Sequence, residues 1–149
     1  MISIYLAASM FSAFERERNE YIEKELLKRG NYNVFLPQRV SPATINGIET
    51  KFNIFELCRD KISESDIVIA IVDGADVDSG VSWELGYAYA KDIPTICVRT
   101  DLRKAEEKGV NVMIEYGSSK VLYLTKYHQN ISCIIENIIE EMESIVYGK

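Results

Sequence analysis

The chain has 149 residues and a formal net charge of −6, and 47% of its residues are hydrophobic while 27% are charged. This length and composition are typical of one compact domain, so we expect residues 1–149 to fold as a single domain. The acidic balance argues against a nucleic-acid partner, which would need clustered Lys and Arg, and no apolar run approaches the roughly 18 residues that cross a membrane.

The first predicted element lies in "MISIYLAASMF", which is apolar but has no basic segment before it. We interpret it as a buried strand rather than a secretory signal. Similar runs, apolar without alternation and rich in β-branched and aromatic residues, are typical of strands covered on both faces. The predicted strands are 2–7, 32–36, 67–72, 95–98 and 121–124. Between and after them, helical patterns occupy 12–29, about 51–64, 81–91 and 131–147.

The alternation of strands and helices predicts a flavodoxin-like or Rossmann-like three-layer α/β sandwich with a five-stranded, mostly parallel sheet. Ligands bind such sheets outside the carboxyl ends of the strands where strand order reverses, usually beside the first and third strands. Two segments leave that edge, "AASMFS" and "DGADVDSG". We therefore expect the functional site there, with the turn-rich stretch 38–50 and the charged stretch 101–110 as loops that could cover it.

Signatures of common cofactor and metal sites are missing. Neither a G-x-G-x-x-G fingerprint nor a Walker A loop follows the first strand, so we expect no cofactor. The cysteines Cys58, Cys97 and Cys133 are widely spaced, and the single histidine, His128, has no partner at ligand spacing, so we expect no metal. The same cysteine usage fits a reducing, cytoplasmic location.

An acidic loop opens the third helical pattern. Asp78 or Ser79 can cap this helix, Gly80 lets a ligand approach the backbone, and Glu84 follows Asp78 by almost two turns. Spacing alone leaves two interpretations open, a solvated turn with a surface glutamate or a carboxylate site at the ligand-binding edge. The second is favoured by signs of close packing of the helix on the sheet, namely Leu85, Gly86, Ala88 and Ala90.

Four segments resemble the nucleoside 2-deoxyribosyltransferase family, whose relatives include 2'-deoxynucleoside 5'-monophosphate N-glycosidases. They are "IYLAASMF", "FLPQ", "SDIVIAIVDGADVDSGVSWELGYAYAKDIPTI" and "NVMIEYG". Each short piece is weak, but the D-x-G-x-x-x-E-x-G-x-A pattern in the third is specific, and the order is that of the family over nearly the whole chain. The resemblance implies transfer of 2-deoxyribose between nucleobases, with deoxynucleosides and free bases as partners, in purine and pyrimidine salvage.

By this resemblance, Glu84 is the catalytic nucleophile. Its carboxylate would attack the anomeric carbon, expel the base and form a covalent deoxyribosyl-enzyme, which a second base attacks with net retention. Asp78 corresponds to the acidic residue that contacts the sugar hydroxyls. Tyr5 corresponds to a tyrosine that hydrogen-bonds the nucleophile, although a core tyrosine on a strand would look the same.

Other positions that match the family would bind the substrate. Phe11 would stack on the base and Gln38 would bond its edge, although Phe11 could be a core residue and Gln38 a loop glutamine. Asn111 matches an asparagine that family members donate from a neighbouring subunit to the 5'-hydroxyl, with Met113 as an apolar wall. Their segment could otherwise be a turn into a short helix. The match implies a homodimer or larger homo-oligomer with shared sites.

Cys58 departs from the family, because many relatives carry there an acidic or amide residue that serves the base. A thiol is a weak hydrogen-bond partner and a poor proton donor near neutral pH. Asp60 lies about 200° away around a helix and cannot simply substitute. The proton for the departing base would then come from another group, from water, or from Asp73 or Asp76.

The first loop departs as well, since the hydroxyls of Ser9 and Ser12 could serve a phosphate. This keeps open a second activity, N-glycosidic hydrolysis of 2'-deoxynucleoside 5'-monophosphates. Asn111 favours a neutral 5'-hydroxyl instead, because the monophosphate glycosidases tend to carry serine there. The thiol of Cys58 keeps open a third possibility, a non-catalytic nucleotide-binding module.

Overall fold

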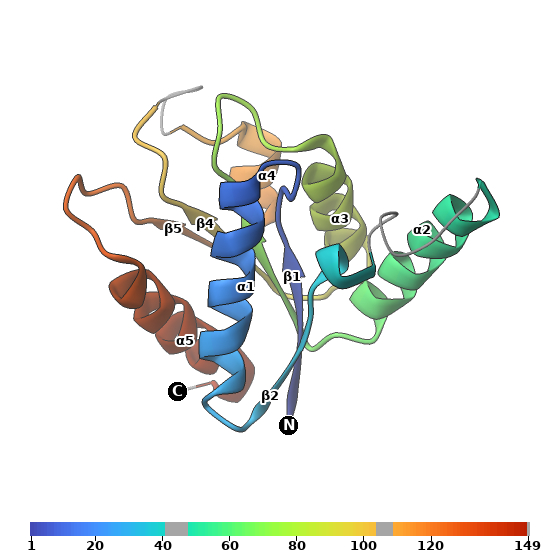
Figure 1. Ribbon diagram of the computed structural model, residues 1–149. Helices are drawn as coiled ribbons and strands as arrows, with labels where there is room; N and C mark the ends of the chain where they lie inside the picture. The colour runs from blue at the N-terminus through green and yellow to red at the C-terminus, as the bar shows by residue number, and fades with distance from the viewer. Residues whose placement is uncertain (41–47, 104–108, 149) are drawn as a thin grey trace.

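A computed structural model describes residues 1–40, 48–103 and 109–148. Five strands alternate with helices in the predicted order (Figure 1). The strands are β1 (Ile2–Ala7), β2 (Tyr32–Phe35), β3 (Ile67–Ile71), β4 (Thr95–Arg99) and β5 (Lys120–Tyr123). The helices are α1 (Ala13–Leu27), α2 (Ile48–Ser63), α3 (Ser79–Ala90), α4 (Val112–Gly117) and α5 (Ile131–Tyr147), with a 3₁₀ turn at Pro37–Val40.

All strand pairs in the sheet are parallel, in the order β2-β1-β3-β4-β5. The chain runs outward from β1 to β2 and then returns to β3 on the other side of β1. Strand order therefore reverses between β1 and β3, as the sequence predicted. The loops after these two strands leave the same edge, which is where ligands bind in open parallel sheets.

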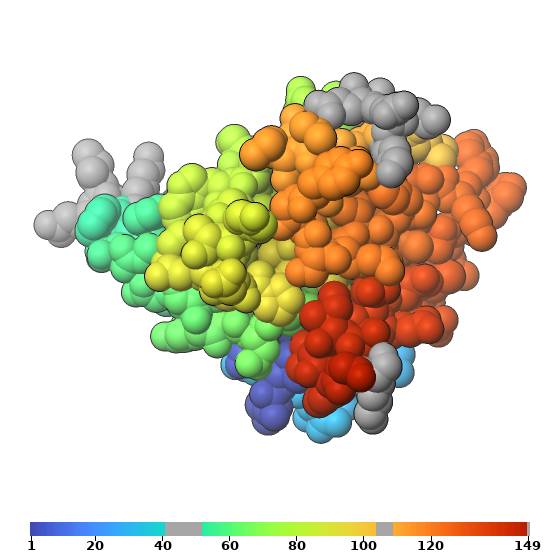
Figure 2. Space-filling model, turned by 180° about the vertical axis from the view of Figure 1, so that it is seen from behind, coloured from blue at the N-terminus to red at the C-terminus, as the bar shows by residue number. Residues whose placement is uncertain are grey.

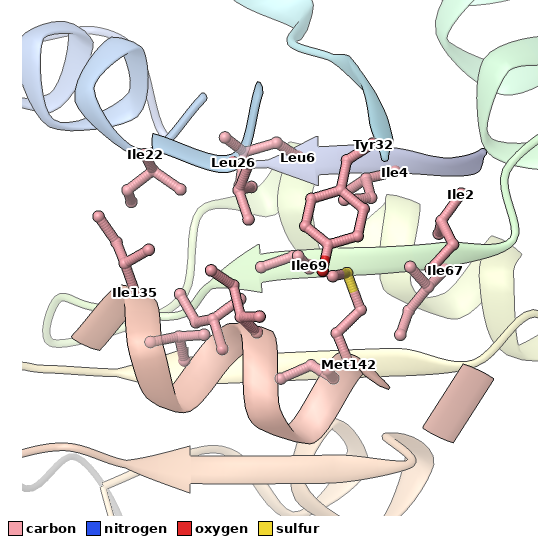
Figure 3. Close-up of a cluster of buried hydrophobic side chains, with 14 of the residues drawn as sticks. Ile2, Ile4, Leu6, Ile22, Leu26, Tyr32, Ile67, Ile69, Ile135 and Met142 are labelled. Atoms are coloured by element: carbon pink, nitrogen blue, oxygen red, sulfur yellow. The ribbon is translucent and has the colours of Figure 1, made fainter. Parts of the chain in front are cut away.

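Helices cover both faces of the sheet, which makes the three-layer sandwich that the sequence predicted (Figure 1). One face packs on α1 and α5, and its core is dominated by isoleucine and leucine, with Ile135 and Met142 of α5 meeting the strands in Figure 3. The other face packs on α2, α3 and α4. None of the helices in the described ranges is both long and apolar enough to cross a membrane.

The central strands are buried because helices cover both faces of the sheet. Every residue of β3 is buried, and so is every residue of β4. The predicted amphipathic pattern of α5 holds, because Ile135, Ile138 and Ile139 face the core while Glu136 and Glu140 are exposed. Asn130 caps this helix by accepting a bond from the backbone N–H of Cys133 at 2.9 Å.

Several predicted boundaries were wrong. The stretch 38–50 is not one loop, since Pro37–Val40 form a 3₁₀ turn and α2 already begins at Ile48, while residues 41–47 lie outside the described residues. Of the predicted loop 101–110, residues 104–108 also lie outside them. The short helix that was left open as an alternative at Asn111 and Met113 is present as α4.

The buried face of α5 gives a test of this core. Ile138→Ala should lower the free energy of unfolding by about 2–5 kcal/mol, because it leaves a cavity at a side chain that is 0% exposed. The exposed Glu136→Ala in the same helix should change it by less than about 0.5 kcal/mol. Denaturant titrations followed by circular dichroism measure both; equal losses would contradict this packing.

Candidate active site

Glu84 lines a cavity of about 360 Å³ at the sheet edge where strand order reverses. The cavity lies between α2, the start of α3, and the loops after β1 and β2. Its walls are mostly apolar, and among the described residues that line it Glu84 is the one with an ionisable carboxyl group. The lining residues are Met10, Pro37, Ile54, Phe55, Cys58, Gly80, Trp83 and Glu84.

Asp78 fixes the start of the helix that carries Glu84. Its side-chain Oδ1 accepts bonds from the backbone N–H groups of Gly80 at 3.0 Å and Val81 at 3.1 Å, so it is the N-cap of α3. A Cβ added at Gly80 would lie 3.1 Å from this same oxygen. Because Gly80 has no side chain, the capping carboxylate of Asp78 fits close to the wall of the cavity that Gly80 lines.

Tyr5 of β1 holds the carboxylate of Glu84 from the sheet side. Its hydroxyl donates to Oε1 of Glu84 at 2.5 Å, although 79 residues separate them in the sequence. The tyrosine is 0% exposed and its ring stacks on Phe35, with centroids 5.5 Å apart. Burial, with the nearby charge of Glu84, raises the pKa of Tyr5, so the hydroxyl stays protonated and remains a donor.

Burial also raises the pKa of Glu84 from 4.5 to about 7. The bond from Tyr5 opposes this shift, because it stabilises the ionised form, while the negative charge of Asp78 adds to it. The carboxyl group is therefore poised between its two forms near neutral pH. A group in this state can act as a nucleophile when ionised and carries a proton at modest cost.

Cys58 of α2 lines the same cavity and completes the group around Tyr5. Burial raises the pKa of its thiol, so the sulfur stays protonated near neutral pH. Asp73 and Asp76, the proposed alternative proton sources, do not line this cavity. Asp73 instead accepts bonds from the backbone N–H of Thr100 at 2.6 Å and of Asp101 at 3.0 Å, and Asp76 faces a different cleft.

A row of aromatic rings forms one wall of the site. Phe55 meets Trp83 edge to face at 5.3 Å between centroids, and Trp83 stacks on Tyr87 at 5.2 Å. Phe52 extends the row and is 61% exposed. The sequence analysis missed Phe55 and Trp83 as wall residues, although helical spacing already paired Phe52 with Phe55 and Trp83 with Tyr87.

A second cleft, of about 680 Å³, lies on the far side of α3, between α3 and α4. Figure 2 shows α3 in the middle of this face, with α2 and α4 on either side. Asn111 and Met113 line this cleft and not the cavity of Glu84, and Met113 is 79% exposed. Asn111 caps α4 by accepting a bond from the backbone N–H of Met113 at 2.9 Å.

The other predicted substrate-binding residues lie near the cavity without lining it. Phe11 is 75% exposed. Ser9 lines a separate cavity of about 160 Å³. The amide of Gln38 is engaged with α1, because its Nε2 donates to the carbonyl of Arg16 and its Oε1 accepts from Asn19 at 3.0 Å.

Asn19 is a buried polar residue that the sequence analysis missed. Its Nδ2 donates to the carbonyl of Ser9 as well as to Gln38, both at 3.0 Å, and the side chain is 0% exposed. It thereby ties the loop after β1 to the turn after β2. The signal available in the sequence was the polar amide of Asn19 on the side of α1 whose apolar residues face the sheet.

Packing of α3 follows the prediction only in part. Val81, Leu85 and Ala88 are buried against the sheet, but Gly86 and Ala90 are exposed, and a Cβ at Gly86 would meet nothing within 4 Å. The inference of close packing from these two small residues was wrong, because they face away from the sheet. No group of three His, Cys, Asp or Glu suited to a metal occurs within residues 1–40, 48–103 and 109–148.

Comparisons with known proteins give a consistent picture. The sequence profile of the nucleoside 2-deoxyribosyltransferases matches residues 4–119. A comparison with curated proteins finds no match. Among solved structures, a 2-deoxyribosyltransferase from Leishmania mexicana is similar with a TM-score of 0.70 at 21% identity, covering 94% of this chain and 98% of that one.

Two further structures share the fold. A 2-deoxyribosyltransferase from Bacillus psychrosaccharolyticus has a TM-score of 0.66 at 20% identity, over 89% of this chain and 95% of its own. A CMP N-glycosidase from Clostridium botulinum, BcmB, has a TM-score of 0.59 at 18% identity, over 95% and 98%. At these identities the likeness establishes the fold.

The raised pKa of Glu84 predicts how stability depends on pH. In the folded protein Glu84 stays protonated up to about pH 7, whereas in the unfolded chain it loses its proton near pH 4.5. The contribution of Glu84 to the free energy of unfolding therefore becomes less favourable as pH rises between these two values. Glu84→Gln should therefore gain stability relative to the parent by about 2–3 kcal/mol between pH 5 and pH 8. Urea titrations at each pH measure this difference.

The exposed Glu140→Gln is the matched control, and its difference from the parent should stay the same across this pH range. A difference for Glu84→Gln that also stays constant with pH would show that Glu84 titrates normally.

Proposed function

The chain belongs to the nucleoside 2-deoxyribosyltransferase family, and from this we propose that it transfers 2-deoxyribose between the nucleobases of 2'-deoxynucleosides through a covalent intermediate on Glu84. The observation that carries the proposal is the hydrogen bond from Tyr5 to Glu84 in a largely apolar cavity. A carboxylate held by a single neutral donor keeps its second oxygen available for attack. The walls provide space for a sugar and a base.

In the first step, the ionised Glu84 attacks the anomeric carbon as the bond to the base breaks, and the electron pair of that bond leaves with the base. The base then takes up a proton. In the second step, an incoming base attacks the same carbon, displaces Glu84 and releases a proton. Each step inverts the carbon, so the product keeps its configuration.

Tyr5 orients the nucleophile and lowers its pKa toward a useful range. Asp78 lies close enough to Glu84 for its charge to raise the pKa of Glu84, and one of its oxygens, Oδ1, is committed to capping α3. Its other oxygen is suited to accept bonds from sugar hydroxyls. Gly80 then gives the sugar room to approach the backbone.

The base is held between apolar walls, with Phe55 and Trp83 as its stacking surfaces. Cys58 stands beside it as a protonated thiol that donates weakly. The proton for the leaving base therefore comes chiefly from solvent at the open side of the cavity. Phe11 and Gln38 adjoin this side, and rearrangement of their side chains would bring them to the base.

A second subunit completes each site in this proposal. Asn111 and Met113 lie across α3 from the Glu84 of their own chain, so they are placed to serve another. Met113, Val112 and Tyr116 give α4 an apolar surface, because these side chains are 51% to 79% exposed. A homodimer or larger homo-oligomer would cover this surface and bring Asn111 to the 5'-hydroxyl.

Hydrolysis of a deoxynucleoside monophosphate is the second candidate, favoured by the likeness to the fold of the CMP N-glycosidase. The phosphate would accept bonds from the hydroxyls of Ser9 and Ser12, since the Ser12 oxygen caps α1 by accepting from the N–H of Glu15 at 3.2 Å and a hydroxyl that accepts can still donate. The small cavity beside Ser9 contains both Arg18 and Asp73, so its charge is mixed.

An exchange assay tests the proposal. The protein incubated with a 2'-deoxynucleoside and a different free base should form the exchanged deoxynucleoside, detected by chromatography. Glu84→Gln should lower the rate by at least about 1,000-fold, because it removes the nucleophile, and Tyr5→Phe should lower it by roughly 10- to 100-fold. A deoxyribosyl mass on the peptide containing Glu84 would identify the intermediate.

Release of base without exchange would overturn transfer, and a kcat/KM at least tenfold higher for the 5'-monophosphate would establish the second candidate instead. Absence of turnover with every deoxynucleoside and monophosphate, with binding retained, would indicate a non-catalytic module.

Mixing of variants tests the shared site. Glu84→Gln and Asn111→Ala should each have low activity alone. After subunit exchange in an equal mixture, half of the dimers are mixed and each holds one intact site of two, so about a quarter of parental activity should return. Glu84→Gln mixed with Tyr5→Phe is the control, because Tyr5 and Glu84 meet within one chain and no recovery is expected. Mixed dimers without recovery would place Asn111 outside the site.

A further inference from the structure

Trp83 is the only tryptophan of the chain, and its ring forms part of the wall of the cavity that contains Glu84. The indole is 47% exposed, and a half-exposed ring on a helix changes rotamer unless its neighbours hold it. Phe55 of α2 meets the indole edge to face, while Tyr87 stacks nearly parallel to it, at an interplanar angle of 10°. Residues four apart on a helix are neighbours on its surface, so Tyr87 is the residue of α3 that selects this rotamer.

Tyr87 is itself fixed by α2. Its hydroxyl lies 3.0 Å from the hydroxyl of Ser63, at the end of that helix. Ser63 donates its one hydroxyl proton to the carbonyl of Arg59 at 3.2 Å, so in the pair with Tyr87 the tyrosine is the donor. The side chain of Tyr87 also packs against the buried core under α3, and Nζ of Lys91 lies 5.6 Å from its ring centroid. The ring is therefore held from α2, from the core and from its own helix.

The link between Tyr87 and the site passes through Trp83. Tyr87 does not line the cavity, and among the described lining residues the one whose ring it contacts is Trp83. It also stands apart from the carboxylate, because the pKa of Glu84 is set by burial, Tyr5 and Asp78. Loss of the Tyr87 ring would thus change the wall and leave the nucleophile in place.

We propose that Tyr87 is a positioning residue for base binding, because it holds the indole of Trp83 in the orientation that forms the cavity wall. The base as the occupant of this wall rests on the proposed function. A wall that is already ordered binds a planar ligand without a further loss of rotamer freedom, whereas a mobile indole must be ordered when the base arrives.

Trp83 also serves as the probe, since no other tryptophan contributes to the fluorescence. Anisotropy decay of the free protein, excited at the red edge of the indole band, measures how far this ring moves. Tyr87→Leu should increase the amplitude of its fast motion by roughly twofold or more, because it removes the stacked ring. Tyr87→Phe keeps the ring and loses only the bond to Ser63, so its increase should be much smaller, and Ser63→Ala should match it.

Binding is measured by quenching of the same fluorescence with adenine and with thymine, free bases that cannot react without a sugar donor. Tyr87→Leu should raise the Kd of the base that binds by roughly 3- to 10-fold, the size expected for the loss of one aromatic pair, and Tyr87→Phe by less than about twofold. Both measurements work without turnover, so they test the positioning even if the protein does not transfer deoxyribose.

Tyr21→Leu is the matched control, because Tyr21 is also a partly exposed helical tyrosine but lies on α1, across the sheet. It should leave the motion of Trp83 and the Kd unchanged. Unchanged motion and affinity in Tyr87→Leu, or equal changes in Tyr21→Leu, would overturn the inference. If Tyr87→Leu does not fold, the absence of added motion in both Tyr87→Phe and Ser63→Ala would overturn it equally. Quenching of the parent by neither base would do so too, since Trp83 would then form no wall for a base.

Exchange kinetics give a separate measure. Tyr87→Leu should raise the KM for the accepting base by roughly 3- to 10-fold and change kcat by less than about twofold, because the wall binds the base while Tyr5 still holds Glu84. A loss confined to kcat would show that Tyr87 acts on the nucleophile and not through Trp83. The expected fluorescence changes in a protein without turnover would contradict only the proposed function.

Discussion

The site depends on one constraint, which is that the carboxylate of Glu84 is partly buried beside apolar walls with a neutral donor from the sheet. Desolvation makes the ionised form costly, and the bond from Tyr5 recovers part of that cost. The result is a carboxyl group with a pKa of about 7, which neither a surface glutamate nor a fully hydrogen-bonded one would have.

The parallel sheet supplies that support at the edge where its ladder ends. Parallel strands leave unpaired carbonyls and N–H groups where they diverge, and buried groups of this kind need partners. Here charged side chains provide them, with Arg99 on the carbonyl side and Asp73 on the N–H side. The same loop then ends in Asp78, which caps α3. The charged side chains at this edge therefore satisfy backbone groups that the diverging strands leave without a partner in the ladder.

Local features were predictable from the sequence, and features that depend on facing elements were not. Continuous apolar runs gave the strands because each is covered on both faces. Asp78 was one of two predicted caps, with Ser79, because capping involves only the next three residues. Gly86 and Ala90 were misjudged because their exposure depends on where α3 sits relative to the sheet. The hydrogen bonds of Gln38 to Asn19 and of Arg99 to the carbonyl of Gly74 are contacts across elements, which no local pattern contains.

The cavity walls also bear on which bases would be accepted. The described lining residues offer aromatic and aliphatic surfaces but few groups that could read the polar edge of a base, and Cys58 donates weakly where an acid or amide would discriminate. An apolar cavity distinguishes similar ligands by only about 1–3 kcal/mol, whereas a buried polar partner rejects a mismatched edge far more strongly. In the proposed transfer, a base would therefore be selected mainly by stacking and size.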